Sequence, residues 1–540
     1  MTIAEAGAPR TASRGAALGT VLAVLFLTFL DTTIVSVTLG NLETGISAGV
    51  IPLQWVVNAY ALVFASLMLL GGSLGDRLGR KRVMIAGIVI FTVGSLMCAL
   101  ASGVAVVIAG RAVMGLGAAA SEPGTLSVIR QLYPQRTQRA RALGAWSAVS
   151  GLALALGPVI GGLLVGAGDW RSVFWFNLAA SIVLLAAVVL FVPESKDPQP
   201  GRIDFAGFVL GAAGLGCVIF AAISGEYKGY TTWWIVTLFV IGGLCLLAFG
   251  PVERRVRNPM LNLSYIRKPI VSSALFAAFA VYFGVFAIFF FTALYLDIGQ
   301  NYSGLRLAGM FAPMAVAIVV GGLATGPWVA RVGSRAPTVA GCALVAVGML
   351  LARVELGHGA DLTFWLLALA LALAGLGFGI TVVPLTSAVL SHVPARHSGM
   401  AASATNTARQ LGAVVGVAVL GAIINSHLTS SVSRLFDQSP LLSALAPSAK
   451  EQVLKILETG GASGSFSLAD IPPSIKTDFL HGVQLALLVA IVLIVLAGLT
   501  AALVREPAPL DDDEVEGQLT STGSTASGSA PPSTSSTGSA

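Results

Sequence analysis

Charged residues are scarce in this chain: Asp, Glu, Lys and Arg make up 10% of its 540 residues. An average soluble domain carries about a quarter. Hydrophobic residues account for 56%, and apolar stretches of about 20 residues recur, each long enough to cross a hydrocarbon core about 30 Å thick. Because a backbone in lipid must satisfy its own hydrogen bonds, this composition excludes a soluble domain and predicts an all-α polytopic membrane protein.

Residues that build metal centres and nucleophilic sites are also rare. The four cysteines lie in apolar runs without the spacing of metal ligands, and none of the five histidines shares such a spacing with a carboxylate. The nucleotide-binding loop Gly-x-x-x-x-Gly-Lys-Ser/Thr does not occur. We therefore expect no metal, no cofactor and no catalytic residue, which disfavours a membrane enzyme. The net charge of +6 fits basic loops and not nucleic-acid binding, since no basic face carries interleaved aromatic residues.

Fourteen segments are long and apolar enough to span a membrane. They lie at residues 16–40, 53–73, 83–101, 104–129, 142–166, 172–193, 204–224, 231–251, 269–295, 306–330, 337–354, 362–390, 399–425 and 481–504. The even number places both termini on one side. Of the 31 lysines and arginines, 21 fall in the loops and tails of that side, so the positive-inside rule predicts cytoplasmic termini.

A short stretch rich in glycine and basic side chains follows the second span. It reads Gly72-Ser-Leu-Gly-Asp76-Arg77-Leu-Gly79-Arg80 and continues with two more basic residues. We interpret it as a tight cytoplasmic loop, in which glycines permit close backbone approach. Asp76 could cap a helix N-terminus or pair with an arginine. An ordinary positively charged loop is the alternative.

A degenerate copy of this stretch follows the tenth span. It reads Gly326-Pro-Trp-Val-Ala330-Arg-Val-Gly333-Ser-Arg, and aligning Gly333 with Gly79 places Ala330 where Asp76 stands. The copy therefore predicts two related halves of six helices each, separated by a pair of inserted helices.

The expected organisation has four parts. Residues 1–200 form the first six-helix bundle, 201–264 the two inserted helices, and 265–505 the second bundle. Within the second bundle, 426–480 is expected to be a long extracellular loop. Residues 506–540 are acidic and then rich in Ser, Thr, Gly, Ala and Pro, so we expect a disordered cytoplasmic tail. The inserted helices are expected at the periphery, without a chemical role.

Ionisable residues inside the spans are functional candidates because a charge at membrane depth is costly. Asp31 interrupts the first span and Arg111 the fourth. Each lies about eight residues from the outer end of its span, so at 1.5 Å per residue both sit ~12 Å below the outer surface and can meet. A structural ion pair is one interpretation, and a pair that opens when a proton binds is the other.

Further polar residues lie deeper. Glu122 follows Arg111 by eleven residues, on nearly the same helical face and three turns further along. Desolvation disfavours the charge of an unpartnered carboxylate, which suits a proton carrier or a cation site. A partnered glutamate near the inner interface is the alternative. In the thirteenth span Asn406, Arg409 and Gln410 share one face, which we expect to face a cavity or the helix bundle.

The fifth span carries a glycine-rich motif, Gly157-Pro158-Val-Ile-Gly161-Gly162. The three glycines should let a neighbouring helix approach closely. Pro158 should bend its helix, because proline removes a backbone donor and clashes with the preceding turn.

Together these features resemble the major facilitator superfamily and, within it, the fourteen-helix drug:proton antiporter family. The stretch from Gly72 resembles the signature between the second and third helices, and the fifth span resembles the antiporter signature Gly-Pro-x-x-Gly-Gly. Similar segments also lie at Leu30–Gly40, Trp55–Tyr60, Arg111 with Gly115, and Ser403–Gly412. The sequence departs from the family pattern at Ser36, Gly40, Met114, Glu122, Ala153 and Asp297.

The resemblance implies two six-helix bundles that rock around a cavity near the midplane. It implies proton-driven efflux of hydrophobic or cationic small molecules such as antibiotics across a bacterial plasma membrane, by a monomer embedded in lipid. Asp31, Arg111 and Glu122 would couple protons, and the Gly72–Arg80 stretch would act as a conformational switch. The candidates for lining the cavity are Trp55, Tyr60, Asn406, Arg409 and Gln410.

Two other functions remain open from the sequence. The first is an importer or proton symporter of a small metabolite, against which the Gly157-Pro158 signature argues. The second is a membrane sensor without transport. A sensor would more naturally carry a folded signalling tail, whereas this tail is of low complexity.

Overall fold

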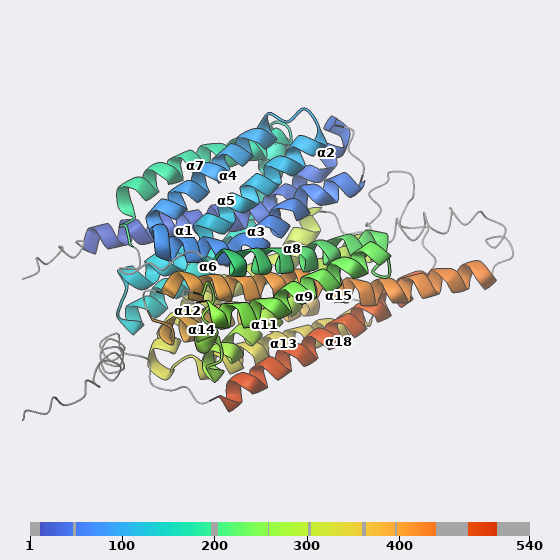
Figure 1. Cartoon of the computed structure of the whole chain (residues 1–540). Coiled ribbons are helices and arrows are strands. Elements are labelled where there is room, and N and C mark those ends of the chain that lie inside the picture. The colour runs from blue at the N-terminus through green and yellow to red at the C-terminus, as the bar shows by residue number, and fades with distance from the viewer. Residues whose placement is uncertain are drawn as a thin grey trace, which may run out of the picture.

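The computed structural model describes residues 11–46, 50–195, 204–256, 259–300, 304–358, 363–394, 397–438 and 473–504. All regular elements in these ranges are helices (Figure 1). In chain order they are α1 (Thr11–Ile34), η1 (Val35–Thr38), α2 (Leu39–Ile46), α3 (Val50–Leu78), α4 (Arg80–Ala99), α5 (Val104–Leu132), α6 (Arg136–Ala167), α7 (Arg171–Phe191), α8 (Phe205–Lys228), α9 (Trp233–Arg255), α10 (Leu263–Ile266), α11 (Pro269–Gln300), α12 (Gly304–Val332), α13 (Arg335–Leu356), α14 (Phe364–Ser391), α15 (Ser398–Gln438) and α18 (Pro473–Leu503).

The number of membrane spans agrees with the sequence. Thirteen helices in the described ranges are long and apolar enough to cross a bilayer. Helix α6 becomes the fourteenth when its two parts, which meet at 43° between Leu154 and Val159, count as one span. The bend falls at Pro158, where the sequence predicts it. The chain is therefore a multi-pass, all-α membrane protein, as predicted.

The basic stretch after the second span is predicted to be a loop, but most of it is helical. Helix α3 continues to Leu78 and α4 begins at Arg80, so Gly79 alone separates them. Gly79 has φ 111°, a value that residues with a Cβ rarely adopt. Gly333, at the same place in the second copy, has φ 85°. A single left-handed glycine makes the first turn, and Gly333 with Ser334 makes the second.

Two other boundaries differ from the prediction. The first span was expected to end at residue 40, but α1 ends at Ile34 and passes through the 3-10 turn η1 into α2. The predicted loop 426–480 is helical at both described ends, because α15 continues to Gln438 and α18 begins at Pro473. Residues 439–472 and the predicted tail 506–540 lie outside the described residues.

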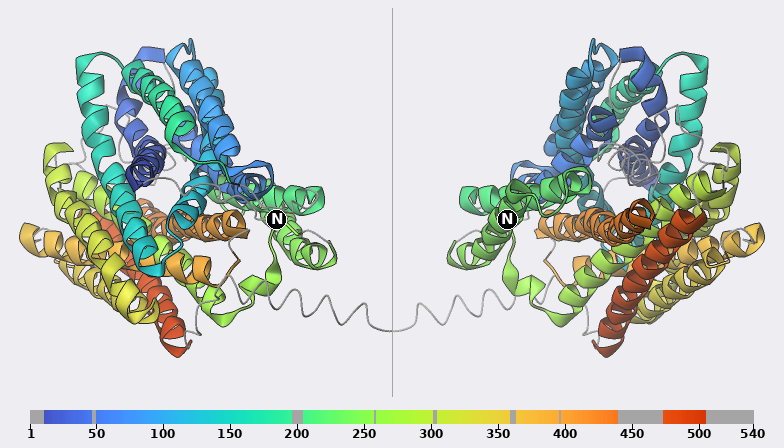
Figure 2. Two further views of the ribbon diagram at one scale, coloured as in Figure 1. Left: turned by 90° about the vertical axis from the view of Figure 1, so that its left-hand side faces the viewer. Right: turned by 90° about the vertical axis from the view of Figure 1, so that its right-hand side faces the viewer.

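The helices form two groups that face each other across a seam (Figure 2). Helices α1 and α3–α7 make one group, and α11–α15 with α18 make the other (Figure 1). Both groups use the same glycine contacts: α5 crosses α4 where Gly117 meets Gly87, and α14 crosses α13 where Gly377 meets Gly341. These matching crossings give the internal repeat a structural basis, since small residues let two backbones approach closely.

The inserted pair α8–α9 lies beside this seam, as Figure 2 shows. Helix α8 packs against both halves, because Ala65 of α3, Ile219 of α8 and Leu411 of α15 belong to one apolar cluster. Tyr230, between α8 and α9, also donates a hydrogen bond to the Ala418 carbonyl of α15 at 3.2 Å. The pair thus lies at the edge of the molecule, as expected, and it also touches both halves, a contact that depends on tertiary packing and could not be read from the sequence.

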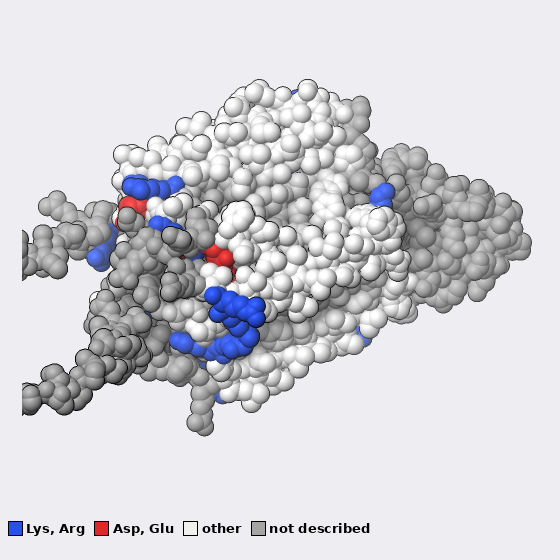
Figure 3. All heavy atoms as spheres, in the orientation of Figure 1, with Lys and Arg blue, Asp and Glu red and all other residues white. Residues whose placement is uncertain are grey.

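Charged side chains gather at one end of the molecule, where α1 begins and α3 ends (Figure 3). A broad belt without charge follows along the helices, with few Lys or Arg side chains at the other end of this face. Such a belt matches the apolar interior of a bilayer. We call the end rich in charge the basic end.

Replacing Gly117 by alanine should destabilise the first half. A Cβ there would stand 2.5 Å from both the Gly87 carbonyl oxygen and the Phe91 amide nitrogen, so the backbones of α4 and α5 would have to separate. We expect a loss of about 1–3 kcal/mol, which is typical of overpacking. Gly243→Ala is the control, because a Cβ on that α9 residue meets nothing within 4 Å. Thermal unfolding in detergent should show a lower midpoint for Gly117→Ala only, and equal midpoints would refute this packing.

Candidate functional site

Asp31 and Arg111 meet as the sequence predicts. Arg111 on α5 donates from Nη1 to Oδ2 of Asp31 on α1 at 2.5 Å, and both side chains are completely buried. Burying two charges is tolerated only when they are well paired and their remaining polar atoms find partners. This pair therefore fixes α1 against α5 inside the first half.

Asn177 on α7 is the second partner of Asp31, and it was not among the residues predicted from the sequence. Its Nδ2 donates to Oδ1 of Asp31 at 2.7 Å, and its exposed fraction is 0%. Both carboxylate oxygens of Asp31 thus accept a hydrogen bond, each from a different helix. An asparagine in the sixth span was the available signal, since polar residues at membrane depth usually face a partner.

Two residues of α3 hold the Arg111 guanidinium in place. Its Nε donates to the Val56 carbonyl at 2.9 Å, and its charge lies 4.5 Å from the centre of the Tyr60 ring. Tyr60 in turn donates its hydroxyl to the Thr28 carbonyl of α1 at 3.1 Å. Nη2 of Arg111 has no hydrogen-bond partner among the described residues. One donor of the guanidinium is therefore available to another acceptor. Tyr60, predicted to line the cavity, instead supports the ion pair.

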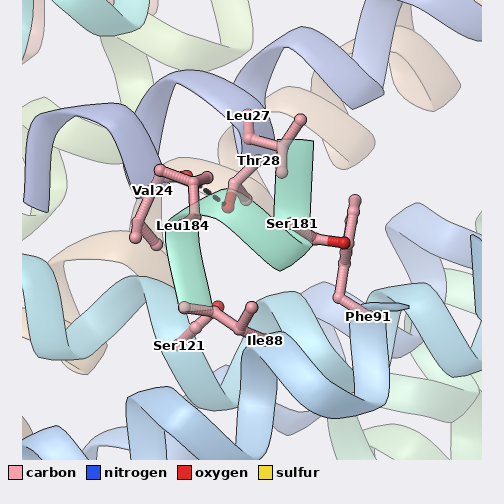
Figure 4. A pocket seen from close by; sticks show the side chains of 8 residues that line it. All are labelled: Val24, Leu27, Thr28, Ile88, Phe91, Ser121, Ser181 and Leu184. Carbon is pink, nitrogen blue, oxygen red and sulfur yellow. Dashed lines mark hydrogen bonds between the residues drawn. The ribbon is translucent and has the colours of Figure 1, made fainter. Parts of the chain in front are cut away.

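A narrow cavity lies beside the Asp31 site within the first half (Figure 4). It is bounded by α1, α4, α5 and α7, and three hydroxyl groups face it, those of Thr28, Ser121 and Ser181. The space within it that a water-sized molecule can reach is about 10 Å³, which holds roughly one water and is far too small for a drug-sized ligand. Because it lies inside one half, it is not the substrate cavity expected between the halves.

Glu122 reaches from α5 across the seam to the second half. Asn406 on α15 donates from Nδ2 to its Oε2 at 2.6 Å, and Oδ1 of Asn406 accepts from Arg409 at 2.9 Å. A single amide therefore links a buried carboxylate in one half to a buried guanidinium in the other. Oε1 of Glu122 has no hydrogen-bond partner in the described part of the chain. The glutamate is partnered through only one of its two oxygens.

Arg409 is held by groups from three further helices. Its Nη2 donates to the Thr386 hydroxyl and, at 3.4 Å, to the Val382 carbonyl, both on α14. The guanidinium carbon lies 5.2 Å from the ring centre of Trp146 on α6 and 5.7 Å from that of Tyr282 on α11. These distances permit cation–π attraction. The site around Glu122 and Arg409 is thus polar at its centre and aromatic at its edge.

Two residues predicted to line the cavity lie apart from this network. Trp55 packs against Phe220 of the inserted helix α8, with ring centres 5.1 Å apart. Gln410 is half-buried and makes no hydrogen bond among the described residues. Adjacent side chains on an α-helix project about 100° apart, so the Gln410 side chain points in a different direction from that of Arg409.

The glycine motif of α6 places that helix directly against the Asp31 segment. A Cβ on Gly157 would collide with Thr33, and one on Gly161 would stand 2.8 Å from the Ile34 carbonyl oxygen. Thr33 also donates its hydroxyl to the Leu154 carbonyl of α6 at 3.1 Å. Gly162 does not share this role, since nothing lies within 4 Å of a Cβ built there. Close approach was predicted for all three glycines, and it occurs at two.

At the basic end, Asp76 joins the two halves. Its carboxylate accepts hydrogen bonds from the backbone N–H groups of Gly399 at 2.9 Å and Met400 at 3.0 Å, in the first turn of α15. Arg80 donates to the same carboxylate from Nη2 at 2.9 Å. The free N–H groups of a helix start attract negative charge. This is the helix-capping contact that the sequence suggested for Asp76, and it crosses the seam.

Neighbouring residues bring the helices close enough for this contact. A Cβ on Gly72 would overlap Gly399 and Ser403 of α15, so only glycine fits. Arg77 is half-buried on the last turn of α3. In the second copy, Gly326 packs against α6, but Ala330 has no carboxylate to bond the start of that helix. The two copies therefore pack alike while only the first carries the polar contact.

The two halves meet again at the basic end through Arg139. Its Nη2 on α6 donates to the Ser391 hydroxyl on α14 at 3.2 Å. Together with the Asp76 contacts, this bond shows that the structure is closed at the basic end. What the arrangement can do chemically is bind and release protons at buried carboxyl groups, and it brings no nucleophile and base together for covalent chemistry among the residues described.

Known proteins with similar sequences are transporters and resistance proteins. The Major Facilitator Superfamily model matches residues 21–417. The chain is 30% identical over 477 residues to "Multidrug resistance protein Stp" of Mycobacterium tuberculosis (strain CDC 1551 / Oshkosh), covering 86% of this chain and 87% of that protein. It is 34% identical over 440 residues to the "Probable actinorhodin transporter" of Streptomyces coelicolor, covering 79% and 76%.

A solved structure shares the fold. The proton:xylose symporter XylE, bound to 6-bromo-6-deoxy-D-glucose, superposes with a TM-score of 0.56 at 14% sequence identity, over 88% of this chain and 95% of that one. At this identity the likeness concerns the fold alone. The matched family, the sequence relatives and the fold agree with the resemblance noted in the sequence motifs, and the chain belongs to the Major Facilitator Superfamily.

Proposed function

We propose that this protein exports hydrophobic or cationic small molecules, antibiotics among them, in exchange for protons across the cytoplasmic membrane of a bacterium. The observation that carries the proposal is the buried Asp31–Arg111 pair, packed directly beside the Gly157 motif of α6. Relatives named for multidrug resistance and for actinorhodin transport support the direction of transport. The gathering of lysine and arginine at one end supports cytoplasmic termini.

The proton would act on Asp31. While Asp31 is ionised, Arg111 and Asn177 donate to its two oxygens and lock α1, α5 and α7 together. A proton on Asp31 cancels its charge, so Arg111 loses its counter-ion and can turn towards another acceptor. Proton entry from the outside would thus loosen the site, and substrate binding from the inside would reverse the change. Asp31 is the coupling carboxylate in this account.

Glu122 is the second candidate for the proton and also a candidate for cation binding. Its oxygen without a partner among the described residues and its exposed fraction of 1% suit an ion pair with a positively charged amine. Such a substrate would have to displace the Asn406 amide. In that role Glu122 recognises the substrate while Asp31 carries the proton.

The expected driving force is the proton gradient. Inside-out membrane vesicles should take up ethidium, a lipophilic cation, when respiration acidifies their interior. A protonophore should abolish that uptake, and vesicles with Asp31→Asn should match vesicles without the protein. The measurement is ethidium fluorescence, with Asp169→Asn as a control because Asp169 is an exposed loop carboxylate. Uptake that survives the protonophore, or that requires ATP, would refute proton-driven efflux.

Asp76 should act as a latch on the state closed at the cytoplasmic end. Asp76→Asn removes the charge that Arg80 and the α15 N-terminus share. Charge-assisted hydrogen bonds contribute about 1.5–3 kcal/mol, so we expect turnover to fall about tenfold or more. Substrate affinity should stay within about twofold, since Asp76 lies far along α3 from the Asp31 site. Equal turnover of mutant and wild type, measured in proteoliposomes, would contradict the latch.

A further inference from the structure

A second buried carboxyl pair lies at the basic end of the inserted helices. Asp204 caps the start of α8, and Glu253 lies in the last turn of α9. Their exposed fractions are 4% and 3%. Neither residue belongs to the transport site, and the sequence analysis gave the inserted helices no chemistry.

Each carboxylate uses one oxygen and leaves the other without a donor. Oδ1 of Asp204 accepts from the Gly207 N–H at 2.8 Å, and Oε2 of Glu253 accepts from the Leu261 N–H at 3.2 Å. Oδ2 of Asp204 and Oε1 of Glu253 have no hydrogen-bond partner among the described residues. Both of these oxygens lie 2.5 Å from the point where a Cβ on Gly207 would stand, so they are at most twice that distance apart.

No positive charge in the described residues compensates the pair. Near the pair along the chain, Phe208 of α8 and Met260 of the connector after α9 belong to one apolar cluster with Leu69 of α3. Arg254 and Arg255 adjoin Glu253 in sequence but are exposed, and neither forms an ion pair with it. Two ionised carboxylates this close, in apolar surroundings, repel each other, whereas one proton turns the repulsion into a hydrogen bond.

The pair is also connected to the Asp76 latch. Glu253 holds the Leu261 N–H, and the next residue, Asn262, donates its N–H to the sulfur of Met400 at 3.2 Å. The N–H of Met400 in turn bonds Asp76 at 3.0 Å. The connector residues 259–262 thus lie between the acidic pair and the start of α15. Movement of Glu253 would therefore displace the start of α15, which Asp76 caps.

We infer that Asp204 and Glu253 bind one proton between them and that this shared proton keeps the 259–262 connector seated on the start of α15. The bound ligand is the proton itself, taken from the aqueous phase at the basic end. Losing it would separate the carboxylates, weaken the Leu261 bond and loosen the latch. The site would make the latch sensitive to pH on that side, independently of the proton on Asp31.

Infrared spectroscopy of the purified full chain in detergent tests this inference without any substrate. Ordinary carboxyl groups are ionised by about pH 6, so a protonated carboxyl that is still present there, and whose carbonyl stretch loses intensity as the pH is raised further, reports the shared proton. Glu253→Gln and Asp204→Asn should each remove the same part of this change, equivalent to one titrating proton. Asp169→Asn, in an exposed loop, should remove none. If either single variant retains the full wild-type change, the proton is not shared and the inference is wrong.

Thermal unfolding of the same samples shows whether each variant is folded, so that a lost infrared change is not mistaken for a failure to fold. Gln and Asn keep the oxygen that accepts the backbone N–H and supply an N–H donor in place of the shared proton. The variants should therefore match the wild-type midpoint at about pH 6. The wild-type midpoint should fall as pH rises, because the proton that joins the pair is lost, while that of Glu253→Gln should stay level. A parallel fall in both proteins would overturn the proposal.

Discussion

The arrangement of the first half depends on one completely buried charge pair. Asp31 and Arg111 have no exposed surface, so each charge needs the other, and Asn177, Val56 and Tyr60 satisfy most of the polar atoms that remain. The pair and its immediate partners therefore connect four helices, α1, α3, α5 and α7. In the proposed mechanism, a proton on Asp31 would cancel its charge and leave Arg111 free to turn away.

The seam between the halves is organised at two levels. At the basic end the halves are joined by backbone N–H groups, as in the contacts of Asp76 with Gly399 and Met400. Deeper, the Asn406 amide links Glu122 to Arg409 across the same seam. In the proposed alternating-access cycle, closure at this end would correspond to one of the two states between which the halves rock. The inserted helix α8 adds an apolar contact to both halves beside this seam.

Much of the fold could be predicted from the sequence, because apolar length and charge scarcity are local properties. The Asp31–Arg111 contact was also predictable, since helical rise gives depth and opposite charges in lipid must pair. Asn177 was missed because one amide among many apolar residues gives no sign of its partner. The predicted loop at Gly72–Arg80 proved mostly helical, as one left-handed glycine suffices for the turn. The packing of α8 and the directions of the Trp55 and Gln410 side chains could not be predicted, because they depend on contacts between segments that are distant in the sequence.

The central claim is that Asp31 carries the proton that is exchanged for substrate. The most direct measurement is proton release from purified protein in weakly buffered detergent solution when ethidium is added, compared among wild type, Asp31→Asn and Glu122→Gln. We predict that wild type releases protons when ethidium binds, and that Glu122→Gln does so wherever it binds ethidium. Asp31→Asn should bind ethidium without releasing protons. Binding is followed in the same samples by ethidium fluorescence. Release that persists in Asp31→Asn and disappears only in Glu122→Gln would place the proton on Glu122 and contradict this account.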